Sequence, residues 1–317
     1  MQYLLIALKA VLPLLLIVLL GYGLKKAGAI RETTSEDLNK LLFKIFLPLL
    51  VFKNVYTSDL EELFSHPTLL YIIIFTIIVF IVFYFIIKLV EKDNKSRGVM
   101  LQGIVRVSAL LFGLPLTASI LAPEKMGIVA LATTLTVFFN AILPATAFAL
   151  YSSSSKQKFS FKELLKQLFT NPILLAALLA LALRAVNLNI PEVLTSTINK
   201  LSAVAIPLAF ILIGAGFKFT KLEKLDSSLV FTVLSRTIIV PALALLGAIL
   251  LGLRNENLLA VLAVFAGPTS VSSYPEAVAH DADTKLANDI VVYTMLVDVF
   301  TIIIFITILA SLGYISA

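Results

Sequence analysis

Ten apolar segments, each close to the length that crosses a bilayer, make up most of this 317-residue chain. A membrane-spanning helix needs about 20 predominantly apolar residues. The mean hydropathy of +1.03 is also above that of soluble globular chains. We therefore expect an all-α polytopic membrane protein, embedded in the bilayer as one integral domain, with ten transmembrane helices at 3–24, 38–56, 68–90, 98–121, 126–150, 168–188, 197–217, 227–252, 257–279 and 286–313.

The polar connections between these segments are too short to fold as separate domains. The longest runs only from Ser152 to Lys166, so any activity has to be carried out within the membrane part. The chain has no cysteine, which excludes disulfides, thiolate nucleophiles and cysteine metal sites. We expect neither a metal nor a cofactor.

Basic residues are concentrated in alternate loops, and short loops rich in Lys and Arg remain in the cytoplasm. The opposite face carries only Lys53, Lys125, Arg184, Arg254 and the borderline Lys200. This pattern predicts a cell-membrane protein with both termini outside the cytoplasm, and it accounts for the net charge of +6 without a nucleic-acid partner. The basic loops carry Lys25, Lys26, Arg31, Lys88, Lys92, Lys95, Arg97, Lys156, Lys158, Lys162, Lys166, Lys218, Lys221, Lys224 and Lys285.

Five spans in each half predict an inverted repeat, because an odd number of spans turns the second half over relative to the first. The halves are 1–155 and 156–317. Similar residues open the second and seventh spans, Leu38-Asn39-Lys40-Leu41 and Ile198-Asn199-Lys200-Leu201. We therefore expect two inverted five-helix repeats.

The fourth and ninth segments are interrupted at corresponding places in the two halves. Val99 to Leu121 contains Gly113-Leu114-Pro115, and Leu258 to Ala279 contains Gly267-Pro268. Proline removes a backbone donor and obstructs the preceding helical turn, and unpaired backbone is tolerated at membrane depth only around a cavity. A pair of broken helices is typical of the binding site of a secondary transporter.

Hydroxyl side chains follow both interruptions. The N–H groups and positive dipole end of a second half-helix suit an anionic group of a substrate. Each hydroxyl has an alternative role, which is to satisfy the backbone of its own broken helix. The substrate-binding candidates from this pattern are Gly113, Pro115, Thr117, Pro268, Thr269, Ser270, Ser272 and Ser273.

Two arginines lie deep in predicted spans, where a charge is costly and therefore a functional candidate. Arg106 is nine residues before Pro115, about 12 Å into its span at 1.5 Å per residue. It is a candidate for binding a carboxylate, or alternatively the partner of a buried acid such as Asp298. Arg236 in the eighth span is a candidate for ion coupling.

Asp298 in the tenth span shares a helical face with Thr294 and Thr301. It is either a proton-carrying acid or the partner of an arginine. Asp289 is a further candidate for ion coupling. It lies nine residues earlier, half a rotation away, so the two acids should not form a catalytic dyad.

Other polar candidates flank the predicted crossing. Glu276 and His280 share one face of the helix. Because a histidine titrates near neutral pH, they are candidates for proton coupling. The alternative is that they form a solvated helix end. Asn140 in the fifth span is a candidate for substrate binding, with an interhelical hydrogen bond as the alternative.

At these residues the chain resembles the auxin efflux carrier family, which includes plant auxin exporters and bacterial carriers of the malonate type. The similarity covers nearly the whole chain. Its motifs are Leu20-Gly21-Tyr22-Gly23, Leu47-Pro48-Leu49-Leu50, Gly113-Leu114-Pro115-Leu116 with Arg106 upstream, and Pro268 to Tyr274. Many members have Asn two residues after the arginine where this chain has Ser108, so Ser108 joins the substrate-binding candidates.

The resemblance implies a scaffold from spans 1, 2, 6 and 7 and a transport part from spans 3–5 and 8–10, moving by elevator-like alternating access. It is also compatible with a homodimer. We expect a carrier for a small organic anion, with coupling to H⁺, coupling to Na⁺ and uniport left open. The rival functions are an intramembrane enzyme, a prenyl transferase or protease for which only Asp281-Ala282-Asp283 offers acids, and a channel. We expect no enzyme.

Overall fold

The computed structural model describes residues 2–58, 67–151, 169–216 and 226–315. Within these ranges the regular structure is helical, except for one isolated bridge between Val107 and Thr269. The predicted boundary between the halves lies outside the described residues. So do Lys156, Lys158, Lys162, Lys166, Lys218, Lys221 and Lys224.

Five helical stretches in the described ranges are long and apolar enough to cross a membrane: Thr68–Val90, Gly127–Tyr151, Glu192–Gly216, Ser227–Leu250 and Thr284–Ser311. Together with shorter apolar helices they indicate a polytopic membrane protein; the ten-span inverted repeat stays a prediction. The first part of the chain contains α1 (Gln2–Lys26), α2 (Glu32–Leu41), the π-helix η1 (Leu42–Phe46), α3 (Leu47–Tyr56), α5 (Thr68–Val90), α6 (Asn94–Val105), the π-helix η2 (Ala109–Gly113), α7 (Leu114–Ala118), the 3₁₀ turn η3 (Pro123–Lys125) and α8 (Gly127–Tyr151). The second part contains α10 (Pro172–Ala185), α11 (Glu192–Ser202), α12 (Ala205–Gly216), α13 (Ser227–Leu234), the π-helix η4 (Ser235–Ile239), α14 (Val240–Leu250), α15 (Asn255–Phe265), α16 (Ser273–Ala279) and α17 (Thr284–Ser311).

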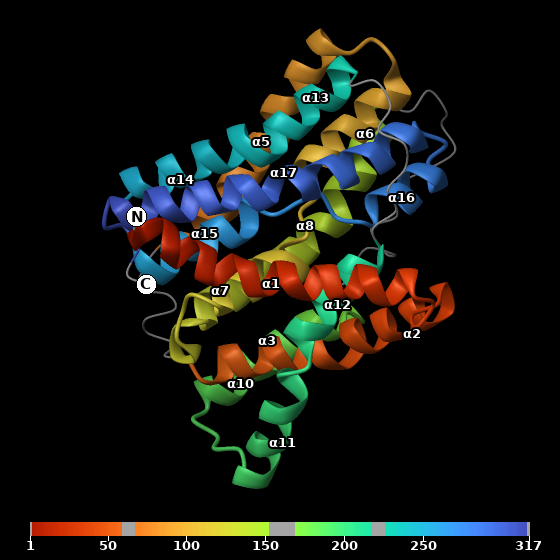
Figure 1. Ribbon diagram of the computed structural model, residues 1–317. Coiled ribbons are helices and arrows are strands. Elements are labelled where there is room, and N and C mark those ends of the chain that lie inside the picture. The colour runs from red at the N-terminus through yellow and green to blue at the C-terminus, as the bar shows by residue number, and fades with distance from the viewer. Residues whose placement is uncertain (1, 59–66, 152–168, 217–225, 316–317) are drawn as a thin grey trace.

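The helices form two groups, which lie one above the other in Figure 1. In the lower group α1 packs along α12 and α3 packs along α10, with α2 and α11 at the ends. The upper group contains α5, α6, α8 and α13 to α17. Contacts of α1 with α17 and of α3 with α8 join the groups.

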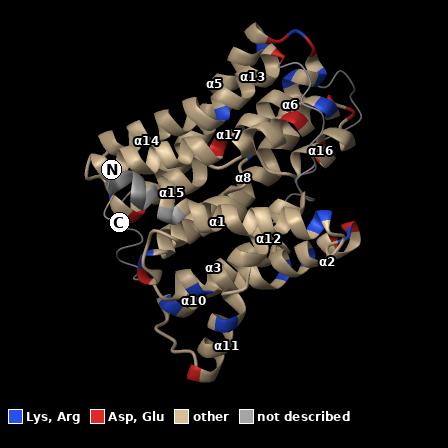
Figure 2. Cartoon of the chain, viewed as in Figure 1, with Lys and Arg blue, Asp and Glu red and all other residues tan. Residues whose placement is uncertain are grey.

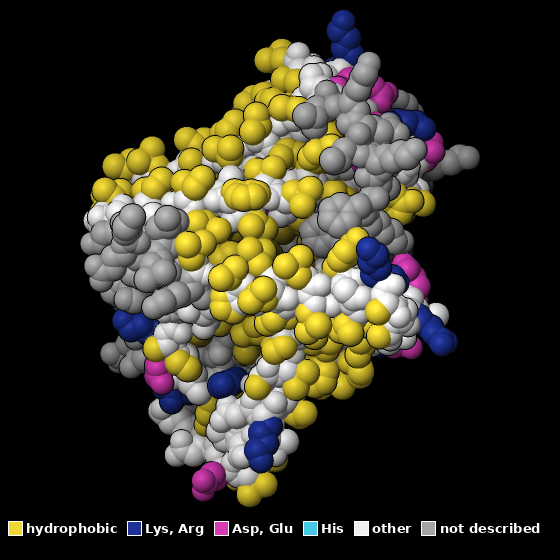
Figure 3. Space-filling model, viewed as in Figure 1, with side chains coloured by type: hydrophobic (Ala, Val, Ile, Leu, Met, Phe, Trp, Pro, Cys, Tyr) yellow, Lys and Arg dark blue, Asp and Glu magenta, His cyan; other side chains and the backbone are white. Residues whose placement is uncertain are grey.

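Apolar side chains cover much of the surface seen in Figure 3, as expected for a protein surrounded by lipid. Charged side chains lie mainly toward the ends of the helices, where they can reach the interface. Figure 2 shows many of them at the ends of α2, α6, α13 and α16. The distribution fits helices that cross an apolar layer.

Each π-helix ends two residues before a proline: η1 before Pro48, η2 before Pro115 and η4 before Pro241. Proline has no N–H to donate to the carbonyl four residues earlier. A wider π turn accommodates that lost bond without ending the helix. These three prolines therefore lie within continuous helices, at the first positions of α3, α7 and α14.

Two glycines allow α1 and α12 to touch backbone to backbone. A Cβ atom added to Gly21 would overlap the carbonyl of Ile211, and one added to Gly214 would overlap the carbonyl of Val18. Small residues at such contacts let helices approach closely in a bilayer, where association depends on van der Waals packing. The α1–α12 pair is therefore held by close packing.

Replacing Gly21 by alanine should lower stability by about 1–3 kcal/mol, because the methyl group has to push α12 away. The measurement is the thermal unfolding midpoint of the purified protein in detergent. Gly23→Ala is the matched control on the same helix, because a Cβ there meets nothing within 4 Å. Equal midpoints for the two variants would contradict the close contact.

Candidate functional site

The two broken helices cross and pair through their unwound segments. The first helix ends at Val105, is interrupted at 106–108 and resumes at η2. The second ends at Phe265 and resumes at α16. The Ser108 N–H donates to the Pro268 carbonyl at 3.0 Å, and the Ser270 N–H donates to the Arg106 carbonyl at 3.1 Å. This antiparallel bridge satisfies backbone groups that lipid would leave unpaired.

The position of the second interruption, Gly267-Pro268, is confirmed, but the predicted position of the first is wrong. It falls at 106–108, several residues before Gly113-Leu114-Pro115. Pro115 lies within the continuous helical stretch Ala109–Ala118, where the π turn η2 accommodates its missing N–H. Gly113 marks instead the contact with α15, because a Cβ there would overlap the carbonyl of Ala263.

The buried side chain of Arg236 binds the carbonyl ends of both broken helices. Its Nε and Nη2 donate to the Gly267 carbonyl at 2.9 and 2.7 Å, and Nη1 donates to the Ile104 carbonyl at 3.2 Å. Only 1% of the residue is exposed. Arg236 also interacts electrostatically with Asp298, which is fully buried.

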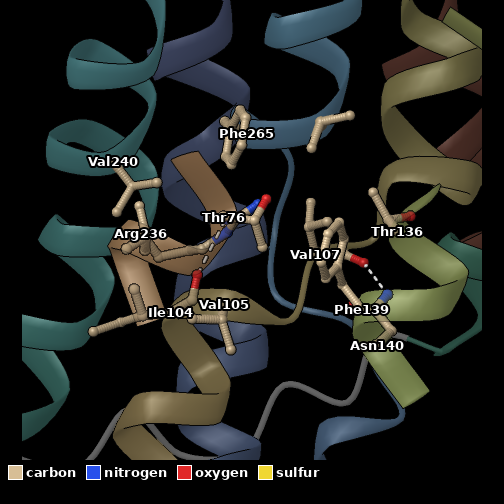
Figure 4. Close-up of a pocket in the computed structure, with 12 residues that line it drawn as sticks. Thr76, Ile104, Val105, Val107, Thr136, Phe139, Asn140, Arg236, Val240 and Phe265 are labelled. Atoms are coloured by element: carbon tan, nitrogen blue, oxygen red, sulfur yellow. Dashed lines mark hydrogen bonds between the residues drawn. The ribbon is translucent and has the colours of Figure 1, made fainter. Parts of the chain in front are cut away.

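Two further side chains complete the crossing. The Asn140 amide donates to the Val107 carbonyl at 2.9 Å, which links α8 to the unwound segment (Figure 4). The Thr269 hydroxyl donates to the Gly103 carbonyl at 2.7 Å, and its N–H donates to the hydroxyl of Thr294. Asn140 thus makes the interhelical hydrogen bond that was the alternative to substrate binding.

Figure 4 shows a small void at this level, lined among others by Arg236, Asn140, Thr76 and Thr136. Its volume is about 20 Å³. A void of this size is too small for an organic molecule. A site for an organic molecule would have to lie elsewhere.

A cavity of about 540 Å³ reaches the crossing from the end of the molecule that carries Lys25 and Glu32. Its volume lies within the range of small-molecule sites, about 300–1,000 Å³. Lys25 and Glu32 form an ion pair at 2.8 Å. The inner end consists of Ser108, Pro268 and Thr269, and the remaining lining comes from Ser35, Asn39, Leu111, Ala209, Leu212, Ile213, Ala215, Gly216, Val271, Tyr274, Asn288, Val291, Val292 and Met295.

Asn39, Tyr274 and Asn288 line the cavity but were not among the predicted site residues. Asp289, the candidate next to Asn288 in the sequence, is half-buried and accepts a weak hydrogen bond from Asn288 at 3.4 Å. A usable signal for Asn288 was its spacing: it precedes Val291, Val292 and Met295 by three, four and seven residues, the pattern of one helical face.

Several predicted hydroxyls are occupied within the protein. Thr117 is fully buried and donates to carbonyls of its own helix at 3.0 Å. Ser270 and Ser272 hydrogen-bond to each other at 2.8 Å. Ser273 is buried, with no partner for its hydroxyl in the described part of the chain. Among the predicted hydroxyl residues, Ser108 and Thr269 line the cavity.

Arg106 forms an ion pair with Glu276 at 2.9 Å, across the two crossing helices. The side chains are 9% and 34% exposed. The alternative predicted for Arg106, a pair with an acid, is therefore found, but the acid is Glu276. Asp298, named as the example, interacts electrostatically with Arg236 and accepts from Thr301 at 3.3 Å. Arg106 is also absent from the cavity lining.

The remaining polar candidates fasten α16 to its surroundings. His280 stacks on Phe148 of α8, with ring centroids 4.5 Å apart. Lys95 donates to Asp281 at 2.8 Å, and this hydrogen bond raises the pKa of Lys95. Asp283 caps α17 by accepting from Leu286 N–H at 2.9 Å. The acids of Asp281-Ala282-Asp283 thus have structural partners.

Comparison with known proteins agrees with this architecture. A family model described as a membrane transport protein matches residues 6–306. The chain belongs to this family. It is the auxin efflux carrier family, so the resemblance drawn from the sequence motifs is confirmed. The protein is therefore a multi-pass membrane transporter by family, which supports a function other than catalysis.

Two archaeal relatives extend over nearly the same length. A protein named as an uncharacterized transporter in Methanocaldococcus jannaschii is 23% identical over 290 residues, covering 89% of this chain and 92% of the relative. Another named in the same way in Methanothermobacter thermautotrophicus is 26% identical over 288 residues, covering 88% and 91%. The similarity covers nearly nine tenths of the chain in each case.

Removing either charge of the Arg106–Glu276 pair should lower stability by about 1–2 kcal/mol, between the values of surface and buried pairs. In a double-mutant cycle of Arg106→Gln and Glu276→Gln, the double variant should lose less than the sum of the single losses. Thermal unfolding in detergent gives the measurement. The exposed Lys95–Asp281 pair serves as control and should show much weaker coupling. Additive losses at Arg106 and Glu276 would contradict the pairing.

Proposed function

We propose that the transporter is a secondary carrier for a small organic anion, a carboxylate with an apolar body. The observation that carries this proposal is the cavity of about 540 Å³ that ends at the crossing of two broken helices. A pathway that stops at unwound backbone near mid-span is the arrangement expected of a substrate site in a carrier. The family membership supports transport as the activity.

The chemistry of the inner end suits a carboxylate. The Ser108 hydroxyl has no hydrogen-bond partner among the described residues and borders the cavity. Next to it begins the ten-residue helical stretch Ala109–Ala118, whose first N–H groups have no partner within the helix. These donors and the positive helix end favour a negative group. The amides of Asn39 and Asn288 supply further polar contacts.

The walls of the cavity suit the apolar remainder of such a substrate. Leu111, Leu212, Val291 and Met295 line it between the polar ends. Small-molecule sites commonly combine mainly apolar walls with a few placed polar groups. This lining favours an organic anion over an inorganic one, because an inorganic anion gains nothing from apolar contact.

The mechanism that we propose is elevator-like alternating access. One wall of the cavity comes from α1, α2 and α12, which belong to the proposed scaffold, and the other from the crossing and α17, which belong to the proposed transport part. A displacement between these groups would change access to a site between them. The cavity opens toward the face of Lys25, which we propose to be cytoplasmic from the distribution of basic residues.

We also retain the inverted repeat, 1–155 and 156–317, as a proposal. Span 1 packs against span 7, as α1 against α12, and span 2 packs against span 6, as α3 against α10. An exchange of partners between halves is what a pseudo-two-fold axis in the membrane plane would produce.

The test is uptake of radiolabelled mono- and dicarboxylates, including malonate and indole acetate, into proteoliposomes under imposed pH, sodium or voltage gradients. Saturable uptake of at least one anion is expected. Absence of uptake under every gradient would contradict the proposal.

Ser108→Leu should reduce that uptake by about tenfold or more, because the larger side chain occupies the inner end of the cavity. Ser227→Leu makes the same chemical change at an exposed residue at the start of α13 and should leave uptake unchanged. Thermal unfolding of both variants checks that they are folded. Wild-type uptake by Ser108→Leu would remove the inner end of the cavity from the pathway.

A further inference from the structure

Two helices direct their carbonyl ends at one point inside the transporter. One is α6, which ends at Val105, and the other is α15, which ends at Phe265. A helix C-terminus carries roughly half a negative charge, so the two ends together carry roughly one. In carriers built from broken helices, such carbonyl ends coordinate the coupling cation.

The guanidinium of Arg236 fills this point. It donates three hydrogen bonds to the carbonyls of Gly267 and Ile104, one from each broken helix, at 2.7 to 3.2 Å. Two further carbonyls at the crossing are also used, since Gly103 accepts from Thr269 and Pro268 accepts from Ser108. A metal cation at this point would compete with Arg236 for the carbonyls of Gly267 and Ile104.

The surroundings keep Arg236 in place. The side chain is 1% exposed, and it does not line the large cavity. The adjoining void of about 20 Å³ has no room for a hydrated ion. Asp298 of α17 is fully buried and interacts electrostatically with Arg236. The charge is therefore fixed to the protein and does not exchange with the solution.

We propose that Arg236 is a built-in cation that replaces a sodium ion at the crossing, so that the transporter neither binds nor needs sodium there. The proposal deepens the proposed carrier function by excluding one mode of coupling at the crossing. Its structural half, the filled cation site, is independent of the substrate. It can therefore be tested without any transport measurement.

The experiment compares thermal unfolding midpoints of the full-length protein in detergent, in sodium chloride and in choline chloride of equal ionic strength. The wild-type midpoint should be the same in both salts, because a ligand that binds only the folded state would raise it. A saturable rise with sodium would overturn the proposal.

Arg236→Ala should open the site. Its midpoint should fall by about 5–10 °C, because two helix ends lose their counter-charge and their buried hydrogen bonds to Arg236. Added guanidinium chloride at low millimolar concentration, or sodium chloride, should recover part of that loss, whereas choline chloride should not. Equal behaviour in all three salts would overturn the proposal, because the vacated space would then not be a cation site.

Arg254 provides a matched control. It also donates to carbonyls at a helix end, those of Ile249 and Leu253, and it lies over the ring of Tyr314. The carbonyls that it binds lie at the end of one helix, α14, and its side chain is partly exposed. Arg254→Ala should show no recovery that depends on the cation, and such a recovery would mean that the effect at Arg236 is unspecific.

Arg236→Lys covers the case in which the alanine variant does not fold. A lysine ammonium retains the charge, so this variant should stay insensitive to sodium even if its midpoint is lower. A sodium response would overturn the proposal. If liposome uptake fails for every anion while these midpoints behave as expected, the carrier proposal fails and the filled cation site stands.

Discussion

The backbone pairing between residues 106–108 and 268–270 is the interaction on which the rest of this structure depends. A bilayer offers no water to unpaired N–H and C=O groups, yet two helices unwind at the same depth. Each unwound segment supplies hydrogen-bond partners for the backbone of the other. Arg236, Thr269 and Asn140 donate to carbonyls that this backbone bridge does not pair. These backbone polar groups at the crossing thus find their hydrogen-bond partners within the protein.

The sequence predicted the existence of this crossing better than its geometry. The second break was visible because Gly267-Pro268 combines a helix breaker with a residue that has no donor. The first break contains neither type of residue, since it consists of Arg106, Val107 and Ser108. It is imposed by the backbone pairing with residues 268–270, which lie about 160 positions further along the chain. A local pattern cannot reveal that contact, and the nearby Pro115 drew the prediction to the wrong place.

The same reason separates the site residues that could be predicted from those that could not. Pro268 and Thr269 were found because they adjoin the second break, and Ser108 was found from the family resemblance; all three border the cavity. Thr117 follows a proline in the same way, but its hydroxyl turns back to its own helix. Asn39 was noticed only as part of a repeat. Its place in the cavity depends on how α2 lies against the crossing. Which acid would face Arg106 was likewise a question of tertiary packing, and the answer was Glu276.

The contact of Gly113 with the backbone of Ala263 has a mechanical consequence. On one side of the crossing the two helices are joined by hydrogen bonds, and on the other they touch with no side chain between them. A sliding motion of one past the other would drive η2 into the carbonyls of α15. The two broken helices are therefore sterically interlocked. In the elevator-like movement that we propose, they would therefore move together as one body, with the gap opening at their border with α1 and α12.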